Sequence, residues 1–284
     1  GGHSYVLVLA DYLTRQGIAV LRMDDRGIGK STGVFAKRTV DDSSQDLAAC
    51  VDFLKTRKDI DAKKIGLVGH SDGVQAASLT ASRSKDVAFV VMMGGQGVTG
   101  EKLTMRQSED GYKALQQSQP LIDFQLELQR RVIETVKEIT DDVKCEVAIH
   151  KRLAEFDARL TDEYRKKLGV GKAFAVRELI GSPAWLRFFH TNDPTKAIRQ
   201  VTCPVLVLHG EKDLIVSAKE NVPAIEGALK EGGNKDHTIK VLPKLNHMLQ
   251  TCEIGAPWEY VQLEETMSPV ALEAMRDWIK EHTK

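Results

Sequence analysis

A serine stands between two glycines in the pentapeptide Gly69-His70-Ser71-Asp72-Gly73. The apolar residues 64–68 before it are expected to form a buried strand, and the small residues 74–81 after it a helix. A serine on such a sharp strand-to-helix turn exposes its hydroxyl and serves as a nucleophile in acyl transfer. We expect the turn to be too tight for flanking side chains, which explains both glycines. The pattern therefore predicts Ser71 as a nucleophile, and a glycine-rich turn beside an ordinary core strand is the alternative.

Two further residues follow expected strands and have the side chains that a serine nucleophile needs. Asp213 comes after the apolar residues 205–208, and His247 comes after residues 237–242. The carboxyl ends of parallel strands share one edge of a sheet, so these side chains should converge with Ser71. His247 would accept the serine proton, Asp213 would orient the imidazole, and the backbone N–H of Asp72 would donate to the oxyanion.

Each of these assignments has an alternative. Asp213 is also a residue type common in solvated turns and helix caps, and Glu211, two positions earlier, is a rival for the acid. His247 taken alone would be typical of a histidine in a surface loop. Their joint placement after successive strands favours the catalytic interpretation.

The elements that must position these residues alternate along the chain. Expected strands cover residues 18–23, 64–68, 87–93, 205–208 and 237–242, and expected helices include residues 4–16, 41–54 and 121–139. The strands are continuous apolar runs without polar alternation, which is typical of strands buried on both faces. The sequence therefore predicts an α/β fold with a mostly parallel sheet covered by helices on both faces.

The middle of the chain differs from the rest because residues 101–199 contain no strand-like apolar run. We expect residues 1–100 and 200–284 to form the core, and residues 101–199 to be an inserted helical cap. A separate helical domain is the alternative, disfavoured because strand patterning begins again directly afterwards.

Composition excludes several classes of function for this chain of 284 residues. Its 40 basic and 40 acidic side chains balance, so charge indicates neither nucleic-acid nor anionic-membrane binding, and no run has the 18 to 20 apolar residues of a membrane span. The four scattered cysteines show neither zinc spacing nor a disulfide framework.

Residues 27–32 resemble the end of a phosphate-binding loop, but Asp24 stands where that motif needs glycine. We expect no cofactor and no metal, whereas the oligomeric state and the compartment (cytoplasmic, or periplasmic or secreted if a leader has been removed) stay open.

Four motifs in order resemble the bacterial α/β-hydrolases known as esterases or serine-aminopeptidase-like enzymes, and the resemblance covers nearly the whole chain. They are Asp24-Asp25-Arg26-Gly27-x-Gly29-x-Ser31, Gly69-His70-Ser71-Asp72-Gly73, Gly210-Glu211-Lys212-Asp213 and Asn246-His247. The resemblance implies a helical cap after the strand that follows Ser71. It also implies strands before the first helix, with a loop that supplies a second oxyanion donor. Because the sequence begins at Gly1-Gly2-His3, we expect those strands and that donor to be missing from it.

The expected function is that of a serine hydrolase that cleaves a small carboxylic ester through an acyl-serine intermediate. One alternative is hydrolysis of amides or short peptides, as in an aminopeptidase, with a carboxylate such as Glu109, Asp110 or Asp193 holding the substrate amine. The other is a non-catalytic protein that binds ligands on the same fold.

Overall fold

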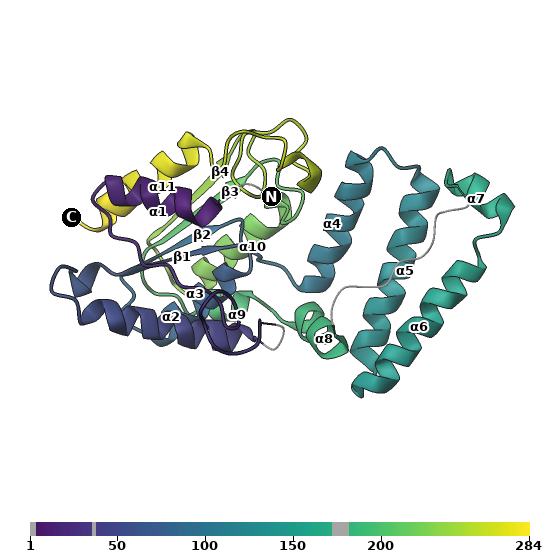
Figure 1. Ribbon diagram of the computed structural model, residues 1–284, viewed down its shortest axis with the longest axis horizontal. Coiled ribbons are helices and arrows are strands. Elements are labelled where there is room, and N and C mark those ends of the chain that lie inside the picture. The colour runs from purple at the N-terminus through teal and green to yellow at the C-terminus, as the bar shows by residue number, and fades with distance from the viewer. Residues whose placement is uncertain (1–3, 36–37, 172–181) are drawn as a thin grey trace. The chain divides into compact units, whose positions relative to one another are not determined.

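The computed structural model describes residues 4–35, 38–171 and 182–284, and it divides the chain into two compact units. The first unit combines Gly1–Gly97 with Pro194–Lys284, and the inserted unit is Val98–Asp193. Figure 1 shows strands only among the described elements of the first unit, whereas the inserted unit is drawn as helices.

The first unit is built on a sheet of four parallel strands in the order β1-β2-β3-β4. Their bounds are Gly66–His70 for β1, Phe89–Met93 for β2, Val205–Gly210 for β3 and His237–Leu242 for β4. All four were expected from apolar runs, and their parallel pairing confirms the predicted sheet. Because the strands run in the same direction, their carboxyl ends lie along one edge.

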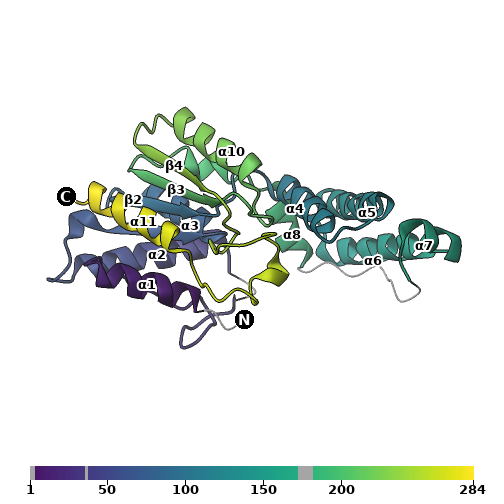
Figure 2. The same ribbon diagram turned by 90° about the horizontal axis from the view of Figure 1, so that it is seen from above.

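Helices cover both faces of this sheet (Figure 2). On one face lie α1 (Tyr5–Arg15) and α11 (Pro269–His282), and on the other lie α2 (Val40–Lys55), α3 (Gly73–Arg83), α9 (Thr195–Ile198) and α10 (Ala218–Glu231). Successive β2 residues alternate between these layers: Val91 packs with α1 and α11, whereas Val90 packs with α2 and α3. Burial on both faces explains why β2 is apolar throughout and why β3 begins with four apolar residues.

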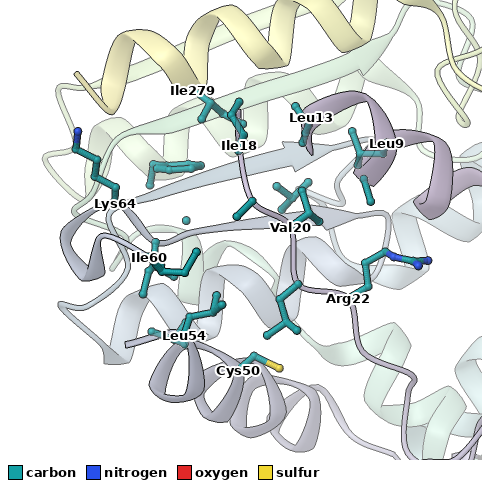
Figure 3. Close-up of a pocket in the computed structure, with 18 of the residues that line it drawn as sticks. Leu9, Leu13, Ile18, Val20, Arg22, Cys50, Leu54, Ile60, Lys64 and Ile279 are labelled. Atoms are coloured by element: carbon teal, nitrogen blue, oxygen red, sulfur yellow. The ribbon is translucent and has the colours of Figure 1, made fainter. Parts of the chain in front are cut away.

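The predicted strand at residues 18–23 is wrong. These residues belong to no strand, and Val20, Leu21 and Met23 are exposed by 38%, 42% and 40%. An apolar run becomes a strand only where its backbone finds a partner, and the described part of the sheet ends at β1 without one on its outer side. The segment instead connects α1 to α2 beside an apolar groove of about 760 Å³, into which Leu13 and Leu54 also project (Figure 3).

The inserted unit has its own hydrophobic core, which includes Phe124, Val132 and Phe156. Its helices are α4 (Gly100–Ala114), α5 (Gln119–Glu138), α6 (Asp142–Ala158), α7 (Asp162–Leu168) and α8 (Pro183–Thr191). The amphipathic pattern predicted over residues 121–139 corresponds to α5. Two short 3-10 turns in the first unit, η2 (Ala62–Lys64) and η3 (Pro257–Glu259), complete the described elements. Across the described ranges, no helix has the length and apolar character that crossing a membrane requires.

Candidate active site

Ser71 lies directly after β1 in a conformation that non-glycine residues rarely adopt. Its φ is +54°, and its N–H donates to the carbonyl oxygen of Met93 at 2.9 Å. A left-handed backbone costs a residue with a Cβ roughly 1 kcal/mol or more, so the surrounding contacts must hold it in place. The strained turn from β1 into α3 is the geometry that the pentapeptide predicted.

The two glycines of the pentapeptide are not equivalent. A Cβ on Gly69 would lie 2.5 Å from the carbonyl oxygen of Gly73, which is closer than real carbon atoms approach. A Cβ on Gly73 would have no atom within 4 Å. The expectation that both positions are too crowded for a side chain is therefore wrong for Gly73, where a Cβ would point into open space.

Asp72 stands at the N-cap position of α3, where its side chain makes no capping hydrogen bond. The first N–H groups of a helix have no partner within the helix, and the helix dipole adds partial positive charge there. The Asp72 N–H is therefore placed, one residue after Ser71, where it could donate to an anion that forms on an acyl group bound to that serine.

Asp213 is buried in the turn after β3, with its side chain fully enclosed. Its Oδ1 accepts the N–H groups of Ile215 at 2.9 Å and Val216 at 2.7 Å, and its Oδ2 lies 2.8 Å from Nδ1 of His247. Burial alone would raise the pKa of Asp213, but hydrogen bonds from His209 and His247 hold it below the usual range of a carboxyl. The carboxylate therefore stays ionised opposite the His247 imidazole.

The loop after β4 presents His247 to this carboxylate. Asn246 is buried, and its Oδ1 accepts the N–H groups of Met248 and Gln250, both at 2.9 Å, which closes the turn around His247. The rival acid Glu211 is exposed and accepts the backbone N–H of Lys244 at 3.1 Å. The structure therefore brings Asp213, and not Glu211, to the imidazole.

His70 links the Ser71 turn to the His247 loop. Its Nε2 lies 2.9 Å from the backbone oxygen of His247, and the two rings are 4.7 Å apart. Because a carbonyl oxygen only accepts, Nε2 of His70 carries the proton. Burial, and then the neighbouring His247, lower the pKa of His70 to about 4, so its imidazole stays neutral near neutral pH.

This lowered pKa makes stability depend on pH. Between about pH 6.5 and the folded pKa of about 4, the unfolded chain binds a proton at His70 that the folded protein does not. The free energy of unfolding should therefore fall as the pH decreases through this window, by about 2 kcal/mol at about pH 4.5 from His70 alone. Urea unfolding of the wild type and of His70→Gln at about pH 7 and about pH 4.5 measures this difference. An equal fall in both proteins would contradict it.

Gly94, directly after β2, leaves the space that the His247 ring occupies. A Cβ there would lie 3.1 Å from Nδ1 of His247 and 3.5 Å from Oδ2 of Asp213, and the φ of Gly94 is +53°. The sequence indicated only that a strand ends at Gly94. Its role depends on a loop more than 150 residues away (247 against 94), so no local pattern could have identified it.

We expect Gly94→Ala to separate His247 from Asp213. A Cβ at 3.1 Å would push the His247 ring by a few tenths of an ångström, which we expect to lower turnover by about 10-fold, and the left-handed backbone adds roughly 1 kcal/mol of destabilisation. Steady-state kinetics on an activated ester, with thermal unfolding, measures both effects. Gly227→Ala in α10 is the control, because a Cβ there meets nothing within 4 Å. Wild-type turnover in Gly94→Ala would show that this space does not matter.

The motif at residues 24–31 forms structural contacts. Arg26 pairs with Asp42 at 2.5 Å and Asp46 at 2.8 Å on α2, and the Ser31 hydroxyl donates to the backbone oxygen of Asp24 at 2.8 Å. The described residues include no group of three or more His, Cys, Asp or Glu side chains placed to hold a metal ion.

Comparisons with known proteins agree with this architecture. The family model described as serine aminopeptidase, S33, matches residues 3–253. Among solved structures, Est1E from Butyrivibrio proteoclasticus is 17% identical, with a TM-score of 0.52 over 99% of this chain and 82% of that one. A monoacylglycerol lipase from Paleococcus ferrophilus is 18% identical, with a TM-score of 0.53 over 99% and 91%. An esterase from Pyrococcus furiosus is 17% identical, with a TM-score of 0.52 over 98% and 73%. No protein of curated function matches the chain by sequence.

Proposed function

From the premise that the chain belongs to the S33 serine aminopeptidase family of α/β hydrolases, we propose that it cleaves carboxylic esters through an acyl-serine intermediate. The observation that carries the proposal is the buried contact of 2.8 Å between Nδ1 of His247 and Oδ2 of Asp213. This pair is tied through His70 to the strained turn at Ser71. An ionised carboxylate on Nδ1 leaves Nε2 of the imidazole free to accept a proton.

In the proposed reaction, the Ser71 hydroxyl attacks the ester carbonyl while His247 takes its proton. The N–H of Asp72 donates to the oxyanion, and Asp213 stabilises the imidazolium that forms. His247 then gives the proton to the leaving alcohol, which completes the acyl-serine. A water molecule, deprotonated by the same imidazole, attacks the acyl group and releases the acid.

The choice of esters over amides rests on two observations. Solved structures with a similar fold include one described as an esterase and one described as a monoacylglycerol lipase. An aminopeptidase would also need a carboxylate available for the substrate amine, whereas Glu109 pairs with Lys113 and Asp110 pairs with Arg106 at 2.7 Å. Both ion pairs join successive turns of α4 and would have to break before either carboxylate could hold an amine.

Two features of the family stay predictions for this chain. We propose that the inserted helical unit serves as the cap that limits the size of the acyl and alcohol groups. We also propose that a second N–H donates to the oxyanion together with the Asp72 N–H.

Fluorophosphonate labelling read by intact mass tests the proposal, because such probes react only with an activated serine. We expect a single adduct, located at Ser71 by peptide mapping, and turnover of short-chain p-nitrophenyl esters above that of aminoacyl p-nitroanilides. Faster cleavage of the anilides would favour the aminopeptidase alternative. A well-folded protein that binds esters but forms no adduct would favour the non-catalytic alternative.

A further inference from the structure

A second histidine, His209, lies against the Asp213 carboxylate oxygen that contacts His247. His209, near the end of β3, is completely buried. Its Nε2 lies 2.6 Å from the backbone oxygen of Val216 and 3.3 Å from Oδ2 of Asp213. Because the carbonyl oxygen of Val216 only accepts, Nε2 carries the proton and Nδ1 does not.

This contact closes the turn that holds Asp213. The N–H of Val216 donates to Oδ1 of Asp213 at 2.7 Å, and the carbonyl of Val216 accepts from His209. Both backbone groups of Val216 are therefore engaged, one by the acid and the other by the imidazole. The position of the carboxylate thus depends on a side chain fixed in the central sheet.

The protonation pattern of His209 argues against a role in packing alone. Its Nδ1 is buried and has no hydrogen-bond partner among the residues that the structure describes. An unpaired buried nitrogen destabilises the fold, and a leucine of similar volume would avoid that cost. A histidine at this position therefore needs another explanation, and its donated hydrogen bond supplies one.

We propose that His209 is a positioning residue, which acts through Asp213 by holding its carboxylate in the orientation that His247 requires. The proposal rests on the proposed function, since it concerns the acid of the same site. His209 contributes no proton to the reaction. Its hydrogen bond to Val216 and its contact with Asp213 keep Oδ2 directed at Nδ1 of His247 when the imidazole becomes charged.

Three variants test this role by kinetics. His209→Leu should lower kcat by about 10- to 100-fold with little change in KM, as is found for residues that orient metal-binding histidines from behind. His209→Gln, whose amide N–H reaches about as far as Nε2, should recover most of the loss. His209→Asn, whose amide is too short to reach Val216, should not. Equal activity of the Gln and Asn variants would overturn the proposal, even if His209→Leu does not fold.

A double-mutant cycle separates positioning from general structural damage. If His209 acts through Asp213, His209→Leu should lower turnover no further in an Asp213→Ala background. If the turnover losses of the two single variants multiply in the double variant, His209 does not act through Asp213.

A third measurement does not depend on activity. The proton between Nδ1 of His247 and Asp213 should give a downfield NMR resonance in the wild type, which His209→Leu shifts or broadens and His209→Gln restores. An unchanged resonance in folded His209→Leu would overturn the positioning role, whether or not the protein turns over esters. Absence of serine labelling in the wild type would count against the proposed function alone.

Discussion

Replacement of Ser71 by alanine is expected to remove the fluorophosphonate adduct and lower ester turnover by about 10⁶-fold. In the proposed mechanism the Ser71 hydroxyl oxygen forms the acyl intermediate, and alanine has no atom that can replace it. Because Ser71 is only partly buried and alanine keeps its Cβ, the variant should unfold at nearly the wild-type temperature. Single-turnover kinetics and intact mass measure the loss.

Ser82→Ala is the matched control for this variant. Ser82 lies in the same helix, α3, and its hydroxyl donates only to the carbonyl oxygen of Leu79 at 2.8 Å. It should label and turn over like the wild type. Undiminished turnover in Ser71→Ala would mean that another residue is the nucleophile, and the proposed mechanism would fail.

Asp213→Asn is expected to lower kcat by about 10⁴-fold while the fold is retained. Asparagine matches the shape of the carboxylate, but its amide group can donate to Nδ1 of His247 where the carboxylate can only accept. The imidazole then carries its proton on Nε2, the nitrogen that should receive the serine proton. Turnover as a function of pH measures the effect, and the loss should diminish at high pH, where hydroxide replaces the base.

Glu211→Gln is the control for the acid. Glu211 is two residues away and exposed, and its contact with the Lys244 N–H can be kept by glutamine. Its turnover should stay within about twofold of the wild type. A loss in Glu211→Gln comparable to that in Asp213→Asn would reverse the assignment of the acid.

The sheet could be predicted from the sequence because its central strands are long apolar runs: β2 is apolar throughout and β3 is apolar over its first four residues. Residues such as Val91 and Val207 lie between two helical layers, so the apolar residues around them were enough to predict that they are buried. The same rule failed at Val20 and Leu21, which are apolar but remain exposed beside the outer edge of β1. Apolar composition indicates that a segment would be stable when buried, whereas pairing depends on a neighbouring strand.

The candidate site was predictable to the extent that each residue follows its own strand. Ser71, Asp213 and His247 were identified in this way, and the structure brings the last two into direct contact. Gly94 and His209 could not be identified. Gly94 leaves space for the His247 ring because it has no side chain, and His209 donates a hydrogen bond to the turn that holds Asp213. Both depend on how separate segments meet, which no local pattern records.

At Ser71 the left-handed backbone favours glycine for stability, whereas the proposed reaction requires a hydroxyl. Glycine would adopt that φ with the least strain, so the substitution most favourable to folding is also one that removes the hydroxyl. Variants selected only for heat resistance would therefore drift toward an inert protein at this residue.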